Sequence, residues 1–354
     1  MIEGVGPVTA RKLIAYSGGV APIFSSKKSI LAKIPGIRDS HISGIFKDDL
    51  LPRAEKELKF IEKNDIQTYY FLDENYPRRI KDLDDSPVLL FGKGNLHLNS
   101  DRIISIVGTR NATEYGKLMT SKVVEELTPF QPLILSGLAY GIDIAAHKAA
   151  LDFGLQTVGV VGHGLDTLYP SLHKPIAEKM MENGGILSAY PSKTSIDPNN
   201  FPDRNRIVAA MTDAVLVMEA GASGGALITA NFASEFKRDV MAFPGRSIDP
   251  YSAGCNDLIK KGKAKMVESS KEIADILGWR LDNQNTKPIQ KQLFVELDEV
   301  EQQIWNTLKL DGKLKMDILS LKIGKSLSQT SSTLFNLELK GIVKCYPGTI
   351  YGLV

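Results

Sequence analysis

Short apolar runs alternate with amphipathic stretches through the middle of the chain, and this alternation constrains the fold more than any other feature. The runs, found between residues 88 and 245, are VLLFG, IISIVGTR, LILSG, TVGVVG, GILSAY, AVLVMEA and DVMAFPG. Runs so rich in Val, Ile and Leu are typical of strands buried on both faces, with helices as the connections between them. The pattern therefore predicts an α/β fold, an extended Rossmann-like, doubly wound parallel sheet.

The composition changes on both sides of this region, which predicts four segments. Residues 1–76 are expected to form a helical module, residues 77–279 the Rossmann-like core, residues 280–295 a linker and residues 296–354 a winged helix. The linker is polar, contains a proline and lacks periodicity, as connections between domains do.

The first segment contains two similar sequences, GVGPVTARKLIAY from Gly4 and KIPGIRDSHISGI from Lys33. Each places a glycine turn before a short helix, which is the layout of helix-hairpin-helix (SAM-like) motifs. The turns of such motifs expose backbone N–H groups that can hold a phosphate, but similar turns also occur as plain connections. The sequence predicts the helical module and leaves phosphate binding by it open.

The last segment has helical periods at 298–310, 314–321 and 327–340, followed by two short strands around a Pro-Gly turn. Three helices and a hairpin indicate a winged helix. Its third helix carries no arginine and has only Lys340 at its end, which argues against strong recognition of a DNA major groove. We expect a protein-interaction or regulatory role for it.

Charge and composition exclude several classes of protein. The net charge is +2 and is spread evenly, so a nucleic-acid partner would have to meet a local basic patch. No apolar run reaches the roughly 18 residues of a membrane helix and no signal peptide is apparent, so the cytoplasm is expected and a membrane is not. Cys255 and Cys345 show no metal-ligand spacing and are expected to be reduced and packed inside. Neither a metal nor a cofactor is predicted.

The turns after the apolar runs are candidate site elements, because doubly wound sheets bind ligands beyond the carboxyl ends of their strands. The turn VGTRNATEYG lacks the second and third glycines of the dinucleotide fingerprint, so NAD is not expected. Arg110 lies in this turn, where a guanidinium can hold a phosphate beside helix N-terminal amides. The alternative is a surface arginine paired with a nearby acid.

A second turn, SGLAYGIDIAAH, begins at Ser136 and opens a helix. Ser136, Gly137 and Gly141 would bring the backbone close to a ligand there. Asp143 and His147 are four residues apart, so they share a helical face and could be drawn as a metal pair. No third ligand is apparent, and a capping Asp with a packed His is the preferred interpretation.

The stretch FPDRNRIVAAMTD places an aromatic ring and two arginines just ahead of an apolar helix. Phe201 can stack on a base while Arg204 and Arg206 hold phosphates, the combination used for unpaired nucleic acid. The alternative is a helix N-terminus with exposed arginines. The helix dipole disfavours cations at that end, which makes a ligand the better explanation.

The stretch EAGASGGALITA contains Gly-x-Ser-x-Gly and raises the possibility of a hydrolase nucleophile elbow. The α/β-hydrolase order requires a histidine after the serine, but the last histidine, His173, precedes Ser223. An anion-binding turn fits better, with Ser223 and Thr229 as hydrogen-bond donors. Glu219 could face a ribose hydroxyl or cap the turn. The lysines of NDLIKKGKAKMV form either a solvated face or an extension of a phosphate track.

Taken in order, these stretches resemble the DNA-processing protein A family, also called DprA or Smf, from about Pro77 to Trp279. The resemblance implies an extended Rossmann core behind an N-terminal helical module, often with a C-terminal winged helix. It implies single-stranded DNA binding without strong sequence preference, interaction with RecA, and help in loading RecA onto incoming strands in natural transformation. It further implies a homodimer formed through the core, and no catalysis.

The resemblance also carries over a set of DNA-binding residues. These would be Gly108, Thr109, Arg110, Ser136, Gly137, Lys174, Phe201, Arg204, Asn205, Arg206 and Asn256. The chain departs from the family where a lysine often stands shortly before the phenylalanine. It has Asp197-Pro198-Asn199-Asn200 there, with Lys193 further back, which puts one phosphate contact in doubt.

Two rivals to this function remain open. One is a nucleotide-processing enzyme or nucleotide sensor, because the GGALITA turn resembles phosphate-binding turns of Rossmann-like nucleoside hydrolases. Glu219 is the only good candidate for the acid or base that such an enzyme needs. The other rival is a regulator that binds duplex DNA through the winged helix.

Overall fold

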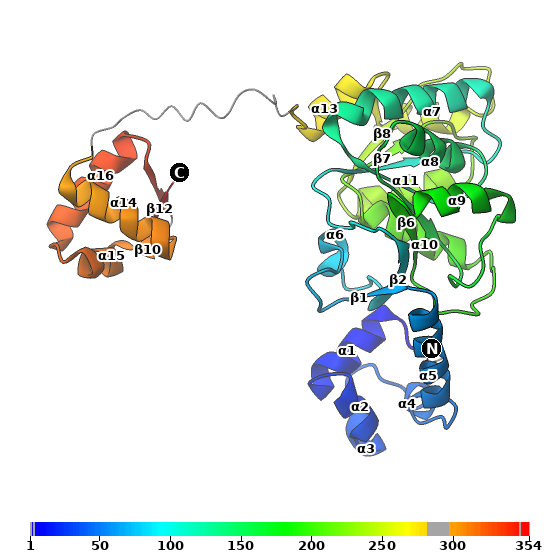
Figure 1. Cartoon of the computed structure of the whole chain (residues 1–354), viewed down its shortest axis with the longest axis horizontal. Coiled ribbons are helices and arrows are strands. Elements are labelled where there is room, and N and C mark those ends of the chain that lie inside the picture. Colours follow the sequence, from blue (N-terminus) through cyan, green and yellow to red (C-terminus); the bar gives the residue numbers. More distant parts are fainter. Residues whose placement is uncertain (1, 3, 282–296, 347, 354) are drawn as a thin grey trace. The chain divides into compact units, whose positions relative to one another are not determined.

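The computed structural model describes residue 2 and residues 4–281, 297–346 and 348–353, and the chain divides into two compact units, Met1–Leu281 and Asp282–Val354 (Figure 1). Most of the predicted linker, residues 280–295, lies outside the described residues.

The first unit begins with helices that enclose a small apolar core of their own. Its buried members are Leu13, Ile23, Leu31, Ile34, Ile42 and Ile45. Proline at the first position and Gly6 at the N-cap start α1, and Gly18 in the left-handed region ends it. The helices are α1 (Pro7–Ser17), α2 (Ala21–Ser25), α3 (Lys28–Leu31), α4 (Asp39–Ile45) and α5 (Leu50–Lys63).

A nine-stranded sheet forms the centre of this unit, in the order β1-β2-β6-β5-β4-β3-β7-β8-β9. The strands from β3 onward run parallel, whereas β1 and β2 are antiparallel to their neighbours. The strands are β1 (Gln67–Tyr70), β2 (Leu89–Gly94), β3 (Ile103–Val107), β4 (Leu133–Ser136), β5 (Thr157–Val161), β6 (Gly184–Ser188), β7 (Ala214–Val217), β8 (Asp239–Ala242) and β9 (Lys265–Met266).

The α/β sheet predicted from the apolar runs is confirmed, and every predicted run contributes a strand. Strand β1 is an addition, because it lies in the segment expected to be helical and pairs with β2 at the sheet edge. The chain passes from β3 outward through β4 and β5 to β6, and then returns to place β7 on the other side of β3. The strand order therefore reverses at β3, and the crevice at such a switch point is where ligands bind in this class of fold.

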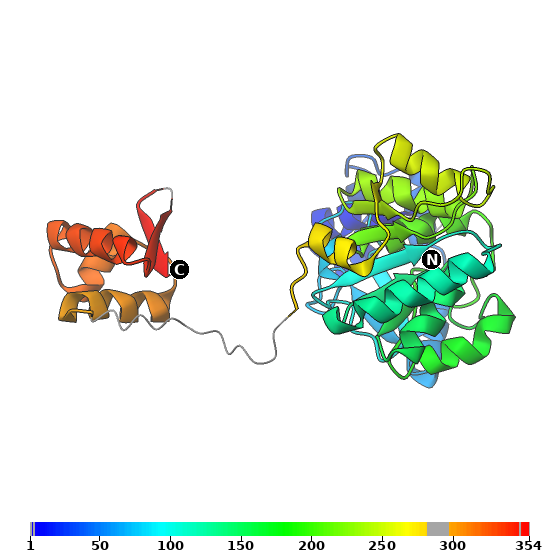
Figure 2. The ribbon, with the colours of Figure 1, turned by 90° about the horizontal axis from the view of Figure 1, so that it is seen from above.

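Helices cover both faces of the sheet (Figures 1 and 2). On β3, Ile104 and Ile106 pack in one cluster while Ile103 and Val107 pack in another, as alternation along a strand requires. The first cluster includes side chains of α7, α8 and α13, and the second includes side chains of α10, α11 and α12. The helices are α6 (Arg78–Lys81), α7 (Glu114–Leu127), α8 (Ile142–Asp152), α9 (Lys174–Met180), α10 (Asn200–Ala210), α11 (Gly225–Glu235), α12 (Ala253–Lys260) and α13 (Ser270–Leu277).

The second unit has its own core around Ile304, Leu319 and Leu334. Its helices follow the predicted periods closely, and a short strand, β10, was not foreseen. Residue Lys340, the one basic residue near the end of α16, is held by the buried Glu301 carboxylate at 2.6 Å. The elements are α14 (Glu299–Asp311), β10 (Leu314–Lys315), α15 (Met316–Ile323), α16 (Leu327–Leu339), β11 (Val343–Tyr346) and β12 (Ile350–Leu353), with sheet order β10-β12-β11. They fit the winged helix that the sequence predicts.

The cysteines differ from each other. Cys255 is buried on α12, and burial raises the pKa of its thiol to about 12. Cys345 is exposed on β11, so the expectation that it packs inside is wrong. Across the described ranges, the structure has no helix with the length and apolarity needed to cross a membrane.

Candidate functional site

A cleft of about 400 Å³ opens at the switch point of the sheet. The loops after β3, β4 and β7 line it, together with the N-terminal turns of α10 and α11. It brings together seven of the eleven predicted site residues, namely Gly108, Thr109, Arg110, Gly137, Phe201, Arg204 and Asn205.

The loops cross so closely that backbone forms much of the cleft wall. The amide of Thr109 donates to the carbonyl of Glu219 at 2.7 Å, and the amide of Ile142 donates to the carbonyl of Thr109 at 3.2 Å. A side chain at Gly141, whose φ is +79°, would collide with the Thr109 carbonyl. These bonds fix the turn that carries Arg110 against the loop after β7 and the start of α8.

One face of α10 supplies the aromatic and cationic side chains. Phe201, Arg204 and Asn205 are spaced i, i+3 and i+4, so they lie on the same side of the helix. The guanidinium of Arg110 lies 5.5 Å from the centroid of the Phe201 ring, and that of Arg204 lies 6.0 Å from it. Arg110 is exposed and has no ion-pair partner among the described residues. Two guanidinium groups therefore lie near one aromatic ring of the cleft lining.

Arg204 is an unusual arginine because it is only 6% exposed. Its Nη1 donates to the carbonyl of Val160 at 2.9 Å, and its Nε is buried without a hydrogen-bond partner. Burial lowers the pKa of the guanidinium, and so does Arg110, while the carboxylate of Asp143 opposes both. A side chain at Gly137 would collide with Arg204 and with Asp143, so only glycine fits beside this buried pair.

Asp143 and His147 are packed groups. Asp143 accepts a hydrogen bond from the Ala139 amide at 3.3 Å, and burial raises the pKa of its carboxyl. The ring nitrogens of His147 lie 2.6 Å from the carbonyl of Gly137 and 2.7 Å from Oγ1 of Thr157. Burial lowers the pKa of His147 to about 4. Both side chains hold the turn after β4. The packed His147 agrees with the interpretation preferred from the sequence, whereas Asp143 does not cap α8, whose N-cap is Gly141 without a side-chain cap among the described residues. The described ranges contain no cluster of ligands that could hold a metal ion.

The glycine-rich turn after β7 leads into α11. Gly224 is the N-cap, and no side chain caps the first turn. The amides of that turn lie at the cleft, where they and the helix dipole favour an anion. The hydroxyl of Thr229 donates to the Gly225 carbonyl at 3.0 Å, so it serves the helix.

Glu219 caps a helix. Its carboxylate accepts hydrogen bonds from the amide of Thr113, at 2.9 Å, and from the hydroxyl of Thr113, at 2.5 Å. Thr113 is the N-cap of α7, so the carboxylate stabilises the start of that helix. Glu219 is buried and is not among the residues that line the cleft. Of the two roles that the sequence leaves open for it, the structure selects the cap.

Four predicted site residues lie outside the cleft lining. The hydroxyl of Ser136 is buried and donates to the Ile106 carbonyl at 2.6 Å, so only its backbone belongs to the turn. Lys174 is exposed at the start of α9 and faces Glu178 at 4.0 Å. The side-chain amide of Asn256 bonds both backbone groups of Gly245, closing the loop after β8.

Arg206, the fourth, lies on another face of α10. It pairs with Asp85 and with Glu235, and its guanidinium packs over the rings of Phe232 and Phe236. Arg206 lies five positions after Phe201, which turns it about 140° around the helix axis. The sequence grouped Arg206 with Phe201 and Arg204 because they are close in the chain, but Arg206 does not line the cleft with them.

Sequence reasoning missed two tyrosines beside the cleft. Tyr140 and Tyr169 line a narrow recess that shares Arg110, Phe201 and Arg204 with the cleft. Each is 43% exposed. The available signal was an aromatic residue directly before a Gly or Pro turn, in LAYG and LYP.

The fold and the cleft define a class, a Rossmann-like protein with a cationic, aromatic-lined cleft at the topological switch point. The family model of DNA recombination-mediator protein A matches residues 67–278 of the chain. The chain belongs to this family.

Named relatives support the membership. The DNA processing protein DprA of Streptococcus pneumoniae is 40% identical over 206 residues, which cover 58% of this chain and 72% of the relative. The DprA protein of Bacillus subtilis is 36% identical over 242 residues, or 68% of this chain and 81% of the relative. The Smf protein of Escherichia coli is 31% identical over 333 residues, or 88% and 87%.

Two solved structures are similar in fold. The X-ray structure of DprA from Streptococcus pneumoniae has a TM-score of 0.68 and 34% identity, and the match covers 77% of this chain and 94% of that one. A structure of DNA processing protein A from Helicobacter pylori, described as showing a unique single-stranded DNA binding mode, has a TM-score of 0.55 and 30% identity. That match covers 60% of this chain and 95% of the other.

Proposed function

We propose that the chain binds single-stranded DNA in the cleft and acts as a recombination mediator that helps to load RecA onto incoming strands. The observation that carries the proposal is the exposed Arg110, which has no ion-pair partner among the described residues and lies beside the Phe201 ring, in a cleft that also includes the first turn of α11. A ring stacks on any base, and guanidinium and amide groups hold phosphates without sequence preference.

The comparisons support the same proposal. The Helicobacter pylori relative is described by its single-stranded DNA binding, and the family is one of recombination mediators. As for other members of this family, we also expect the protein to help load RecA, to form a homodimer through its core and to act in the cytoplasm.

The positions of acids favour binding over catalysis. A nucleotide-processing enzyme needs a carboxylate poised over a ribose, and the candidate, Glu219, is engaged by Thr113. The carboxylate that does line the cleft, Asp143, is buried beside Arg204 and has a raised pKa. We therefore propose that the protein is not an enzyme.

The test is fluorescence-anisotropy binding of a labelled oligo-dT and of its duplex across a salt series. We expect a preference for the single strand, and we expect Arg110→Ala to lose about 1–3 kcal/mol of binding free energy and to lower the salt slope by about one. The loss follows from the removal of one phosphate contact and its released counterion.

Arg53→Ala is the matched control, since it also removes one positive charge but lies on α5, where it pairs with Asp49. It should leave the binding within about twofold of wild type. A preference for duplex, or equal losses in the two variants, would move the DNA site out of the cleft.

A further inference from the structure

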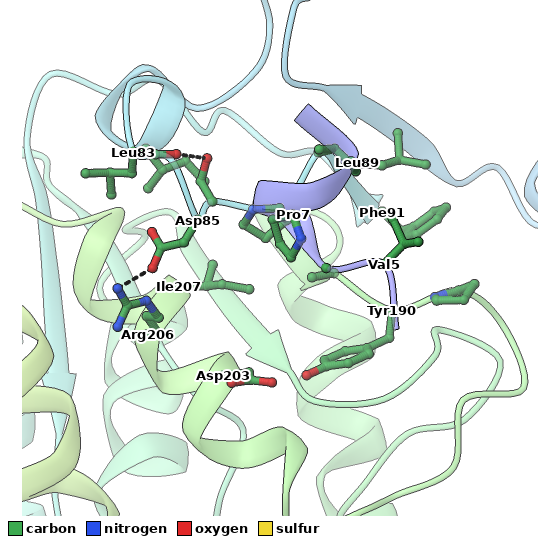
Figure 3. A pocket seen from close by; sticks show the side chains of 18 of the residues that line it. Val5, Pro7, Leu83, Asp85, Leu89, Phe91, Tyr190, Asp203, Arg206 and Ile207 are labelled. Carbon is green, nitrogen blue, oxygen red and sulfur yellow. Dashed lines mark hydrogen bonds and ion pairs between the residues drawn. The ribbon is translucent and has the colours of Figure 1, made fainter. Parts of the chain in front are cut away.

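A second cavity, of about 930 Å³, lies between the N-terminal helices and the sheet (Figure 3). It is separate from the DNA cleft, because no residue is shared between the two linings. The segment before α1 and one side of α5 form one wall, and β2 with the loop before it and α10 form the other. We call it the α5–α10 groove.

The body of the groove is apolar. Val5, Leu89, Phe91 and Ile207 face into it (Figure 3), and Leu58 and Ile61 of α5 close the other side. Cavities of about 300–1,000 Å³ with such walls and a few polar groups are typical of sites for small organic molecules. The size and walls therefore fit a ligand with a substantial apolar body.

Three of the six polar side chains that line the groove are acids, and one, Arg206, is a cation. Both oxygens of Glu57 are engaged by Ser192, whose amide and hydroxyl donate at 2.8 and 2.6 Å. Asp85 is engaged by Arg206, as Figure 3 shows. Asp85 thus has a cationic partner, and the oxygens of Glu57 have hydrogen-bond donors.

Asp203 is the exception. It has no ion-pair partner among the described residues, and it faces the Tyr190 hydroxyl inside the groove (Figure 3). Burial raises the pKa of Tyr190, and the neighbouring Asp203 carboxylate raises it further, so the phenol stays protonated beside a negative charge. Since Ser192 is neutral, neither Asp203 nor Glu57 has a cationic partner among the described residues, and the groove presents an apolar body with unneutralised negative charge.

We propose that the α5–α10 groove binds a small organic cation, an apolar molecule that carries one protonated amine. The apolar body contacts Leu58, Phe91 and Ile207, and the ammonium pairs with Asp203. Because α10 also carries Phe201 and Arg204 on its other side, the ligand contacts the helix that forms the DNA cleft.

The experiment uses the full chain and three probes of nearly equal shape, measured by isothermal titration calorimetry. They are 2-naphthylmethylamine, which is protonated at neutral pH, the neutral 2-naphthalenemethanol, and 2-naphthoate, which is an anion at neutral pH. We expect saturable binding in the order amine, alcohol, acid, with a preference of roughly three- to tenfold for the amine over the alcohol.

Two substitutions separate the charge from the apolar body. Asp203→Asn should abolish the preference for the amine and leave binding of the alcohol unchanged; because Asp203 is exposed, the substitution spares the fold. Ala54→Trp, on the groove side of α5, should block all three probes, whereas Glu55→Trp, exposed on the same helix and outside the lining, should block none.

Other outcomes overturn the proposal. These are no saturable binding of any probe, equal binding of amine and acid to the wild type, or binding that Ala54→Trp does not reduce. Since no DNA is present, none of these outcomes bears on the cleft.

Discussion

The two sides of α10 hold arginines in opposite circumstances. On the cleft side Arg204 is buried with a single hydrogen bond to the Val160 carbonyl, an unpartnered Nε and a pKa lowered by burial. On the groove side Arg206 is a third exposed, pairs with two carboxylates and packs on two rings. The same residue type, two positions apart, is left short of partners on one side and fully partnered on the other.

The difference indicates what each arginine is for. A guanidinium that is already paired with carboxylates, as Arg206 is, stabilises the protein. An anionic ligand would have to displace those carboxylates before it could bind there. A guanidinium buried with one nitrogen unpartnered pays part of its desolvation cost uncompensated, even where a neighbouring carboxylate and carbonyl offset the rest, and such a group is a candidate for contact with an anionic ligand. The contrast therefore supports the cleft side of α10 as the proposed DNA-binding side, whereas Arg206 fastens α10 to the segment before β2.

The sharpest test of this contrast is the pair Arg204→Met and Arg206→Met. Arg204→Met should reduce single-stranded DNA affinity more than tenfold and lower the free energy of unfolding by about 2–3 kcal/mol, because it removes a charged hydrogen bond and strands Asp143. Arg206→Met should leave DNA affinity within about twofold and cost about 1 kcal/mol of stability, since its ion pairs are partly exposed. Anisotropy titration and urea unfolding measure the two effects.

An equal loss of DNA affinity in both variants would show that Arg206 contributes to DNA binding as much as Arg204 does. A loss of stability without a loss of affinity in Arg204→Met would make Arg204 a purely structural residue.

A substitution at Gly137 tests the packing around Arg204 on the cleft side of α10. In Gly137→Ala the new methyl collides with Arg204 and Asp143, which are both buried and cannot swing into solvent. We expect a loss of about 2 kcal/mol in the free energy of unfolding, with weaker DNA binding as Arg204 is displaced.

Gly6→Ala is the control on the groove side. A Cβ there meets no atom within 4 Å, so the cost should stay under about 1 kcal/mol, that of a changed N-cap, and DNA binding should not change. If Gly137→Ala and Gly6→Ala were equally stable, the close packing of Gly137 against Arg204 would be refuted.

The strands were predictable from sequence because burial on both faces leaves a simple signal, runs of Val, Ile and Leu such as IISIV before Arg110. The cleft followed, since parallel strands end at one edge and their turns must meet there. Strand β1 was missed because QTYY is short and polar, and its place is set by pairing with β2.

The individual site residues were harder to predict. Arg206 is close to Phe201 in sequence, but the helical period places it on another side of α10. Glu219 follows a strand just as a catalytic acid would, and only the fold brings Thr113 within hydrogen-bond distance of it. The α5–α10 groove has no sequence signal, because its walls come from segments far apart in the chain.

The smallest expected effect concerns His147, which holds the Gly137 carbonyl on the cleft side. Its pKa is lowered from 6.5 to about 4, mainly by burial. As the pH falls below about 6.5 the unfolded chain binds a proton there, whereas the folded chain does not until about pH 4. The free energy of unfolding should therefore fall with acidification, and His147 should contribute about 1 kcal/mol of that loss between pH 7 and pH 5.5.

Urea unfolding of the wild type and of His147→Gln at both pH values isolates this contribution. Asp143, whose pKa is raised, acts in the opposite direction, but it titrates in both proteins and cancels in the difference. If His147→Gln lost as much stability on acidification as the wild type, protonation of His147 would not account for the loss. The contrast between the two sides of α10 would then depend on the arginines alone.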